Sequence, residues 1–435
     1  MENSDKIRII RHCLEHIIDY MNEHREMFVV NPKADFVRNK KVKFEDILKI
    51  ILSMKGESID KEIYDYFAGD IESIFRGNNF CQLREKIRDD AFEFLFDMFN
   101  IAVPDRKTYK GYKLLAVDGS ELDSFYDNKE VDKLEENESS LYHLNVAYDL
   151  LSKTYTHAIL QSKGEIDERK ALVEMLKNTN PTEKRLYICD RGYPSWNVFT
   201  HFKYTENTDF LIRYPNNGST LTSNLPNATF DIMQNIVVTN TKLYNSRRFL
   251  SQDYYAYVSP NVQWDFGKKE RLKLRIIRFE WMPGEYETLV TSLSKEEFPF
   301  EEIKKLYKMR WGVETSFKNL KYPMGVNQLS NRRKNFVKQD LFARLTMYNF
   351  YQRIMNEIEV IQNERKSCKY QTNFVMSSHI CRDYFLDRIT DDAVVILISK
   401  YSYPIKEENG EKVVATCEEE DLENIDSNFE DGLSE

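Results

Sequence analysis

Four side chains that could bind a metal ion and phosphate are spaced so that they would share one stripe of a helix. Tyr307, Arg310, Glu314 and Lys321 stand at offsets of 0, 3, 7 and 14 residues. At 3.6 residues per turn, these offsets fall within an arc of about 60°. The neighbouring arc is apolar and holds Leu306, Met309, Val313, Phe317 and Leu320. The pattern predicts a packed helix with a carboxylate, two cations and a phenol along one edge. Ordinary ion pairs on the wet edge of an amphipathic helix would give the same spacing.

Two aspartates upstream could complete a set of three carboxylates. Asp118 ends an apolar run and is followed by Gly119, and Asp190 ends a second apolar run with Gly192 two residues later. Ligands gather where the strands of an open α/β sheet end, although a single aspartate there is more often a turn residue. Three acidic groups can hold two divalent cations about 3.5–4 Å apart, which suits phosphodiester chemistry. Oxygen ligands alone favour Mg²⁺ or Mn²⁺ over zinc.

With these motifs in view, the chain resembles the DDE transposases of bacterial insertion sequences, in particular the insertion-sequence-four group. The signature that this group has around its third carboxylate, Tyr-x2-Arg-x3-Glu-x6-Lys, stands here at Tyr307, Arg310, Glu314 and Lys321 without departure. The stretch Val-Asp118-Gly-Ser resembles the first motif of the group, and Cys-Asp190-Arg-Gly-Tyr resembles the second. The resemblance covers residues 30 to 360 and is most specific in these three blocks.

The resemblance implies a catalytic site and a set of DNA contacts. Asp118, Asp190 and Glu314 would be the catalytic residues and the ligands of two Mg²⁺ or Mn²⁺ ions. Tyr307, Arg310 and Lys321 would hold phosphates near the cleavage point, Arg310 by bidentate contact and Lys321 as a point charge. With the cations of the basic β-rich segment discussed below, the full set of candidate DNA-binding residues is Tyr307, Arg310, Lys318, Lys321, Arg271, Lys273 and Arg275.

The resemblance also implies a reaction. Cut-and-paste transposition begins with cleavage that leaves a 3′-hydroxyl, which can attack the opposite strand to form a hairpin and later joins target DNA. All these steps are in-line phosphoryl displacements. Relatives stack a flipped base on a tryptophan in the strand before the third motif. Here residues 287–292 contain no tryptophan, and Trp281 or Tyr286 would have to substitute. The expected partners are double-stranded DNA, as terminal inverted repeats and as target, and a second copy of the chain in the DNA complex.

Composition is that of a globular protein, because 41% of the 435 residues are hydrophobic and 13% are aromatic. No apolar run reaches the 18 or more residues of a membrane-spanning helix, and the first residues do not resemble a secretion signal. The six cysteines are scattered without a CxxC pair, which indicates a reducing cytosol rather than disulfides or zinc. We therefore expect a cytoplasmic protein without a membrane partner. The resemblance implies that it is bacterial and associates with the nucleoid when it acts.

Net charge is unusual for a protein that handles DNA. The chain carries −9, but residues 407–435 hold twelve acidic residues and one lysine, so the remainder carries about +2. We expect that tail to be disordered, as a solubilising extension or as an acidic mimic of DNA. Any contact with DNA must then come from local basic patches.

Periodicity predicts an α/β fold, and the resemblance gives it a ribonuclease H-like mixed sheet core with a β-rich insertion and a helical N-terminal domain. The expected divisions are 1–105 (helical, possibly DNA-binding), 106–214 (first part of the core), 215–285 (β-rich insertion), 286–360 (second part of the core with the Glu314 helix), 361–405 (C-terminal helices) and 406–435 (acidic tail). His143 and His157 lie in expected strands, and we interpret both as structural.

Basic clusters mark candidate DNA contacts in two of these parts. Residues 38–43, before the second expected helix, hold four cations that could grip phosphates or simply form a solvated loop. Arg271, Lys273 and Arg275 alternate along an expected strand, so they should share one face, either as a DNA track or as the wet side of a sheet. The pairs Arg247-Arg248 and Arg332-Arg333 are further candidates.

Three functions remain open at this stage. The first is an active cut-and-paste transposase, and the second is a transposase-derived DNA-binding protein that no longer cuts. The third is a metal-dependent nuclease or phosphatase of similar core that acts on other phosphate esters. The three acidic residues favour the first, although the acidic tail and the nearly neutral remainder of the chain lower the DNA affinity that we expect. The basic β-rich segment argues against the third.

Overall fold

The computed structural model describes residues 2–38, 42–68, 70–123, 140–215, 221, 226–241, 249–250, 253–328, 333–365, 369–408 and 411–414. The Arg247-Arg248 pair, Arg332, two lysines of the 38–43 cluster and nearly all of the acidic tail therefore lie outside the described residues. The chain divides into two compact units. We call residues 1–103 with 342–435 the helical unit, and residues 104–341 the sheet unit.

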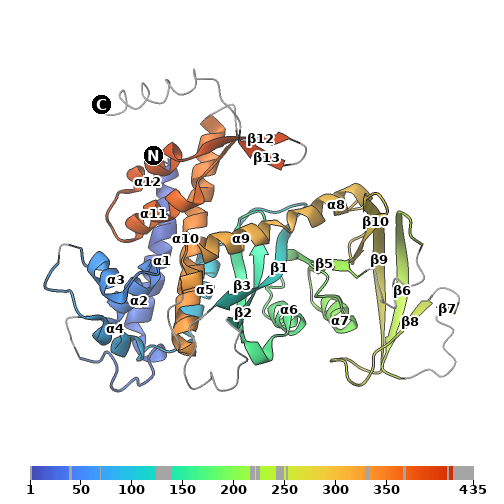
Figure 1. Ribbon diagram of the computed structural model, residues 1–435, viewed down its shortest axis with the longest axis horizontal. Helices are drawn as coiled ribbons and strands as arrows, with labels where there is room; N and C mark the ends of the chain where they lie inside the picture. The colour runs from blue at the N-terminus through green and yellow to red at the C-terminus, as the bar shows by residue number, and fades with distance from the viewer. Residues whose placement is uncertain are drawn as a thin grey trace. The chain divides into compact units, whose positions relative to one another are not determined.

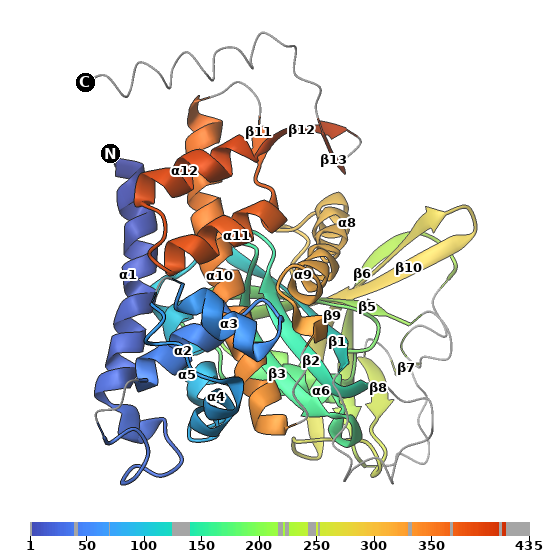
Figure 2. The same cartoon turned by 60° about the vertical axis from the view of Figure 1, so that its left-hand side comes forward.

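The helical unit is built from helices at both ends of the sequence (Figures 1 and 2). Its first half contains α1 (Glu2–Glu23), α2 (Phe44–Ser53), α3 (Ile59–Tyr66), α4 (Gly77–Arg84) and α5 (Ala91–Ala102). Its second half contains most of α10 (Lys334–Arg365), then α11 (Phe374–Phe385), α12 (Asp391–Lys400) and a small sheet of β11 (Lys369–Gln371), β12 (Tyr403–Glu408) and β13 (Glu411–Val414). Lys6 of α1 pairs with Glu357 of α10 across 3.2 Å, which ties the two halves together.

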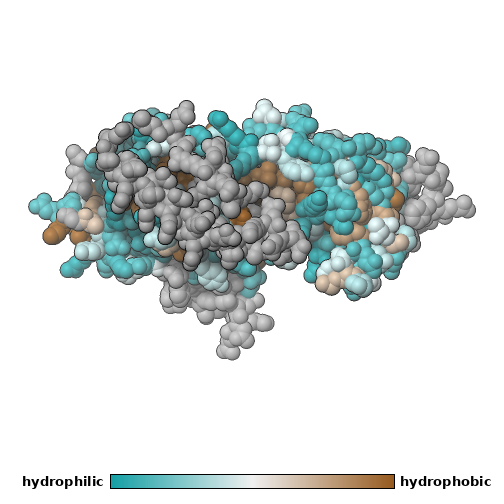
Figure 3. Space-filling model, turned by 90° about the horizontal axis from the view of Figure 1, so that it is seen from above, coloured by the Kyte–Doolittle hydropathy of each residue, from teal (hydrophilic) through white to brown (hydrophobic). Residues whose placement is uncertain are grey.

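None of the helices in the described part of the chain combines the length and the apolar character needed to span a lipid bilayer. On the face drawn in Figure 3, hydrophilic side chains predominate outside the grey atoms.

The sheet unit contains one ten-stranded mixed sheet in the order β3-β2-β1-β4-β5-β10-β9-β6-β8-β7. Its strands are β1 (Tyr112–Asp123), β2 (Ser140–Asp149), β3 (Thr154–Ser162), β4 (Lys184–Cys189), β5 (Thr208–Tyr214), β6 (Phe230–Thr239), β7 (Phe249–Leu250), β8 (Asp253–Tyr257), β9 (Lys269–Met282) and β10 (Glu285–Thr291). Strands β1, β4 and β5 pair in parallel, while β1, β2 and β3 form an antiparallel meander. The expected α/β class with a mixed sheet is confirmed.

Helices cover the two faces of this sheet (Figure 1). One apolar cluster joins the sheet to α6 (Glu168–Lys177) and α7 (Trp196–Tyr204), and a second joins the opposite face to α8 (Phe300–Met309). Helix α9 (Gly312–Lys321) lies on the side of α8 and contacts β1. The strands that were expected to form an insertion, β6, β8 and β9, continue the same sheet because β9 pairs with β10.

The stripe from Tyr307 to Lys321 is carried by two consecutive helices, which corrects the expectation of one continuous helix. The backbone N–H groups of Arg310 and Trp311 bond to carbonyls three residues back rather than four, so the chain tightens there. Both residues keep right-handed helical backbone angles, and the stripe therefore continues into α9. A Cβ on Gly312 would come within 2.9 Å of a Leu150 methyl carbon, so the glycine lets the start of α9 approach Leu150.

The expected row of three accessible cations on β9 is wrong for Arg275. Arg271 and Lys273 are exposed, but Arg275 is 0% exposed. Its Nε and Nη2 atoms donate to the two oxygens of Asp231 at 2.9 and 2.7 Å, and Nη1 donates to the carbonyls of Ser294 and Phe298. Period-2 alternation gave the correct face, but the loop after β10 covers that face at Arg275. This residue holds the sheet together and is not placed to meet DNA.

Replacing Arg275 should therefore destabilise the protein. Arg275→Ala leaves Asp231 with Lys295 as its remaining ion-pair partner and removes the donor to the Ser294 and Phe298 carbonyls. The expected loss of unfolding free energy is about 3–5 kcal/mol. Urea denaturation followed by circular dichroism measures this loss. The exposed Arg271→Ala is the matched control on the same strand and should stay within about 0.5 kcal/mol of wild type. Equal stability of the two variants would contradict a structural role for Arg275.

Candidate active site

Strand pairing places Asp118 and Asp190 next to each other. Strands β1 and β4 are parallel neighbours, and the last pair in their register is Val117 with Cys189. Each aspartate is the next residue after that pair. Because neighbouring strands lie about 4.8 Å apart, residues that follow a paired position start side by side. The two carboxylates are thus brought together by the backbone of the sheet and need no loop to do so.

Alternation along the strands sends both aspartates to the same face. Leu114 and Ile188 belong to the apolar cluster under α8, and even-numbered neighbours in both strands point the same way. Asp118 and Asp190 therefore face α8 and α9. Asp118 does not end its strand as expected, because β1 continues to Asp123 by pairing with β2 after its pairing with β4 has stopped.

Arg310 links the third carboxylate to the first. It follows α8, and Glu314 lies one turn later in the first turn of α9. The Nη2 atom of Arg310 donates to Glu314 Oε1 at 3.1 Å, and Nη1 lies 3.5 Å from Asp118 Oδ2. The Arg310 side chain is buried, and its Nε makes no hydrogen bond to a described residue. One guanidinium is therefore shared between carboxylates that are nearly two hundred residues apart in sequence.

Asp190 has its own polar surroundings. The Tyr307 hydroxyl lies 3.5 Å from Asp190 Oδ1, and the Tyr307 side chain is 6% exposed. Burial, reinforced by the charge of Asp190, raises the pKa of Tyr307 well above its usual value, so the phenol stays protonated and can donate. Glu287 of β10 also carries charge near Asp190 and is paired with Arg213 of β5 at 3.0 Å.

Opposing influences act on the pKa of the Asp118 carboxyl. Burial raises the pKa of the Asp118 carboxyl to about 6, and the nearby Glu314 and Asp190 add to the rise. The Arg310 guanidinium and the backbone N–H of Gly119, which donates at 3.0 Å, lower that pKa. The same three carboxylates, with Tyr307, raise the pKa of Arg310, although burial alone lowers it. Asp118 therefore feels the negative charges of Asp190 and Glu314 directly, and the buried Arg310 cation opposes them.

The ligand types suit a hard divalent cation, because all three side chains offer carboxylate oxygens. Within the described ranges, however, no three His, Cys, Asp or Glu side chains stand close enough to hold a metal ion. Arg310 accounts for this spacing, since its guanidinium is hydrogen-bonded to Glu314 and contacts Asp118. The residues fit a divalent site in charge and chemistry, with a guanidinium now supplying the positive charge.

The other side chains that were expected to contact DNA differ in their solvent exposure. On α9, Lys318 is exposed and Lys321 is half-buried, and neither has an ion pair with a described residue. Trp281, suggested as a base-stacking residue, is 52% exposed near the turn between β9 and β10. Sequence reasoning missed Trp311, which is 59% exposed and has the Arg310 guanidinium 5.3 Å from its ring centre. Its position directly after Arg310 in the signature was the signal that could have found it.

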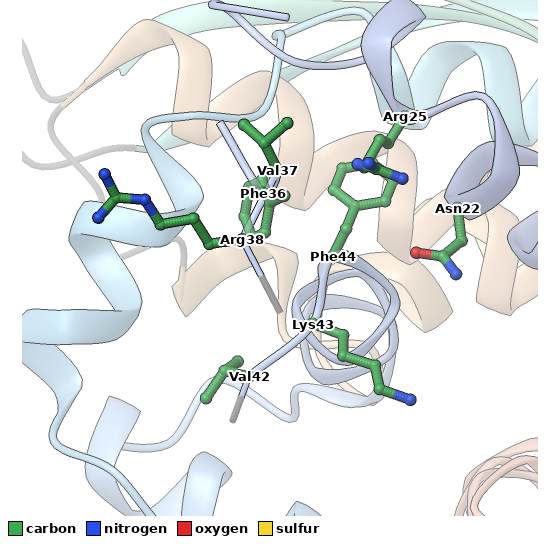
Figure 4. Close-up of a pocket in the computed structure, with 8 residues that line it drawn as sticks. All are labelled: Asn22, Arg25, Phe36, Val37, Arg38, Val42, Lys43 and Phe44. Atoms are coloured by element: carbon green, nitrogen blue, oxygen red, sulfur yellow. The ribbon is translucent and has the colours of Figure 1, made fainter. Parts of the chain in front are cut away.

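A second candidate site lies in the helical unit, where part of the 38–43 cluster lines a cavity of about 250 Å³ (Figure 4). Its lining residues are Asn22, Arg25, Phe36, Val37, Arg38, Val42, Lys43 and Phe44. Phe36 has a positive φ of 53° and packs edge-on against Phe44. Lys43 lies 3.4 Å from Glu45, while Arg25 and Arg38 have no ion pair recorded with a described residue. The cavity thus combines aromatic walls with available cations.

Comparison with known protein families gives a match that covers most of the sheet unit. A family model described as a transposase DDE domain matches residues 109–350, which is more than half of the chain. The chain belongs to the transposase DDE-domain family. This DDE domain contains all three carboxylates and the Tyr307–Lys321 signature. No match was found among curated protein sequences.

Among solved structures, this DDE transposase chain is similar to a piggyBac transposase seen by cryo-electron microscopy in a synaptic complex with hairpin DNA. The TM-score is 0.43 and the sequence identity is 11%, and the match covers 92% of this chain and 80% of that one.

The burial of Asp118 leads to a prediction about stability. Its folded pKa of about 6 lies above the usual 3.8, so its contribution to stability is fully present below about pH 4 and is lost as pH rises through 6. Asp118→Asn replaces the ionisable carboxyl with a neutral amide, so the variant does not lose this stability as pH rises. In EDTA at pH 7.5, the variant should be more stable than wild type by about 1–3 kcal/mol, since two pKa units correspond to about 3 kcal/mol.

Urea denaturation at two pH values checks this expectation. The advantage of Asp118→Asn should disappear at pH 4, where the wild-type carboxyl is already protonated. The control is Glu301→Gln on the exposed side of α8, which should change stability little at either pH. A less stable Asp118→Asn at pH 7.5 would show that the charged carboxylate stabilises the fold.

Proposed function

We propose that this DDE transposase catalyses metal-dependent cleavage and strand transfer at the ends of an insertion sequence of the insertion-sequence-four group. The supporting observation is the Arg310 guanidinium, which contacts Asp118 and Glu314 and whose charge interacts with Asp190. The complete Tyr-x2-Arg-x3-Glu-x6-Lys signature adds to this support. The reaction would be cut-and-paste transposition.

We also propose that β1 to β5 with their crossover helices form a ribonuclease H-like core. The strand order β3-β2-β1-β4-β5, with an antiparallel meander followed by parallel strands, supports the proposal. The parallel connections run through α6 and α7, which cover one face and leave the other free for α8 and α9. The carboxylates lie on the face that carries the signature helices.

In this proposal, Asp118, Asp190 and Glu314 would hold two Mg²⁺ or Mn²⁺ ions. Bound divalent cations would supply Lewis-acid stabilisation of an in-line phosphoryl displacement. The Tyr307 hydroxyl, kept protonated by burial, faces Asp190 and would donate its one proton either to Asp190 or to a phosphate oxygen. Arg310 would exchange its carboxylate contacts for bidentate contact with a phosphate at the cleavage point, since a guanidinium suits either partner.

Double-stranded DNA is the proposed partner, both as the terminal inverted repeats of the element and as target. Lys318 and Lys321 would neutralise phosphates beside the site, and Arg271 with Lys273 would extend the track along β9. Trp311 is better placed than Trp281 to stack on an unpaired base, because it adjoins Arg310. A homodimer in the DNA complex and a bacterial cytoplasmic, nucleoid-associated location belong to the same proposal.

The basic cavity of the helical unit would take part in the same DNA complex. Its lining includes the cations Arg25 and Arg38, the Glu45-paired Lys43, and the aromatic side chains of Phe36 and Phe44. Phosphate contacts of this kind raise affinity without reading the base sequence.

One alternative deserves a direct test, namely a transposase-derived DNA-binding protein that does not cut. The spacing of the acidic side chains favours it, because no three of those in the described part of the chain stand close enough to hold a metal ion. A nuclease or phosphatase acting on other phosphate esters is less well supported, because the exposed cations of β9 would then have no role.

Cleavage of element ends tests the proposed activity. The substrate is duplex DNA spanning the inverted repeats that flank the reading frame, incubated with Mg²⁺ and resolved on denaturing gels. Wild type should cut at the repeat boundary, while Asp118→Asn, Asp190→Asn and Glu314→Gln should each lose about two orders of magnitude or more in rate. Glu301→Gln should retain full activity. Binding without cleavage by wild type would support the alternative, and cleavage of unrelated DNA at equal rate would support a general nuclease.

Electrostatic contacts along β9 give a separate expectation. Arg271→Ala with Lys273→Ala should weaken DNA binding and reduce the slope of log affinity against log salt by about 2, because each phosphate contact releases about one counterion. Fluorescence anisotropy at several salt concentrations measures the slope. The reference is Lys304→Ala on α8, whose side chain pairs with Glu301. An unchanged slope in the double variant would remove β9 from the DNA track.

A further inference from the structure

Two glycines adjoin the candidate catalytic aspartates, and the space beside each is filled by another side chain. Gly119 follows Asp118 in β1 and points to the opposite face, toward α6, because neighbouring residues of a strand alternate. A Cβ built on Gly119 would stand 2.2 Å from His143 Nε2 and 2.7 Å from Glu168 Oε1. The glycine is therefore needed for this close approach.

Gly192 has a similar environment in the turn after Asp190. A Cβ built there would stand 2.9 Å from the other oxygen of the Glu168 carboxylate, Oε2. The next residue of α6, Arg169, donates from Nε to the carbonyl of Gly192 at 2.9 Å. Consequently, one carboxylate at the start of α6 packs against the backbone that follows both aspartates.

The start of α6 is itself firmly held. Asp167 caps the helix by accepting from the backbone N–H of Lys170 at 3.0 Å. The amide side chain of Gln161 on β3 donates to the Asp167 carbonyl and accepts from the Asp167 N–H, at 3.2 and 3.1 Å. Asn145 of β2 donates to the same Gln161 oxygen at 2.9 Å. The sheet thus fixes the position from which Glu168 reaches the two glycines.

His143 completes the arrangement on the β2 side. Its Nε2 atom lies 3.3 Å from Glu168 Oε1 at an angle that makes no hydrogen bond, and its side chain is 11% exposed. The imidazole therefore packs between Gly119 and the carboxylate and restricts where Glu168 can turn. This role agrees with the structural interpretation of His143, but it is exerted next to Asp118.

We propose that the Glu168 carboxylate is a positioning group that fixes the separation of Asp118 and Asp190. It acts from the face of the sheet opposite to the carboxylates, through the backbone at Gly119 and Gly192. Groups of this kind matter because ligands must be held within about 0.5 Å of their working geometry by the residues around them. The inference rests on the proposed function, since it gives Glu168 a role in the proposed divalent-cation site.

The contact is tested first in metal-free protein, where catalysis plays no part. Gly119→Ala should lower the melting temperature in EDTA, because His143 and Glu168 must move to admit the new methyl group. In a protein that also carries His143→Ala and Glu168→Ala, Gly119→Ala should lower the melting temperature by less than half as much as it does in wild type. Equal costs in the two backgrounds would overturn the proposal, since they would show that the glycine does not need these neighbours.

The consequence is tested by Mn²⁺ binding, followed through the electron paramagnetic resonance signal of free Mn²⁺. Glu168→Ala should weaken Mn²⁺ binding by about 10- to 100-fold, the usual effect of losing a residue that orients metal ligands. Glu168→Gln keeps the shape between the two glycines and should bind within about threefold of wild type. Glu174→Ala, on the exposed side of the same helix, is the matched control and should match wild type.

The outcomes separate this inference from the proposed function. Both the positioning role and the proposed metal site are supported if wild type binds Mn²⁺, Asp118→Asn abolishes that binding and Glu168→Ala weakens it. The melting temperature of Glu168→Ala must then be unchanged. Wild-type binding that Glu168→Ala leaves intact overturns the positioning role and leaves the proposed function standing. Absence of Mn²⁺ binding by wild type overturns the proposed metal site, and with it the role given to Glu168.

Discussion

The site depends on one electrostatic constraint, which is that three carboxylates share the field of one buried guanidinium. Burying Asp118 beside Glu314 and Asp190 raises its pKa to about 6, and this arrangement would repel itself without a cation. Arg310 supplies that cation from the junction of α8 and α9, where the chain tightens between the two helices. Arg310 belongs to the Tyr307–Lys321 signature and also neutralises the acidic cluster, so it links the fold of helices α8 and α9 to the electrostatics of the site.

The sheet supplies the second constraint. Parallel pairing of β1 with β4 fixes Asp118 beside Asp190, and alternation turns both toward α8 and α9. The opposite face is equally specified, because Gly119 and Gly192 leave room for Glu168. The Asp-Gly and Asp-Arg-Gly stretches thus have two different faces, with acidic side chains on one side of the sheet and close packing on the other. The glycines serve this packing as well as any turn.

The strands of the sheet and the signature on α8 and α9 could be predicted from the sequence, since apolar alternation located the strands and residue spacing located the signature. What failed depended on contacts between distant segments. Alternation placed Arg275 on the correct face, but only the fold reveals that Asp231 and the loop after β10 cover it. Helical periodicity could not reveal the tightened turn at Arg310, because residues there keep helical backbone angles. The closeness of Glu168 to Gly119 carries no sequence signal, since it arises from the packing of α6 on β1 and β2.

The most direct test of a shared carboxylate site is anomalous diffraction from crystals of the full chain soaked in Mn²⁺. We expect anomalous peaks bounded by the Asp118, Asp190 and Glu314 carboxyl groups, with the Arg310 guanidinium displaced from its present contacts. Peaks at other carboxylates, or Arg310 still seated between Asp118 and Glu314 at saturating Mn²⁺, would contradict it.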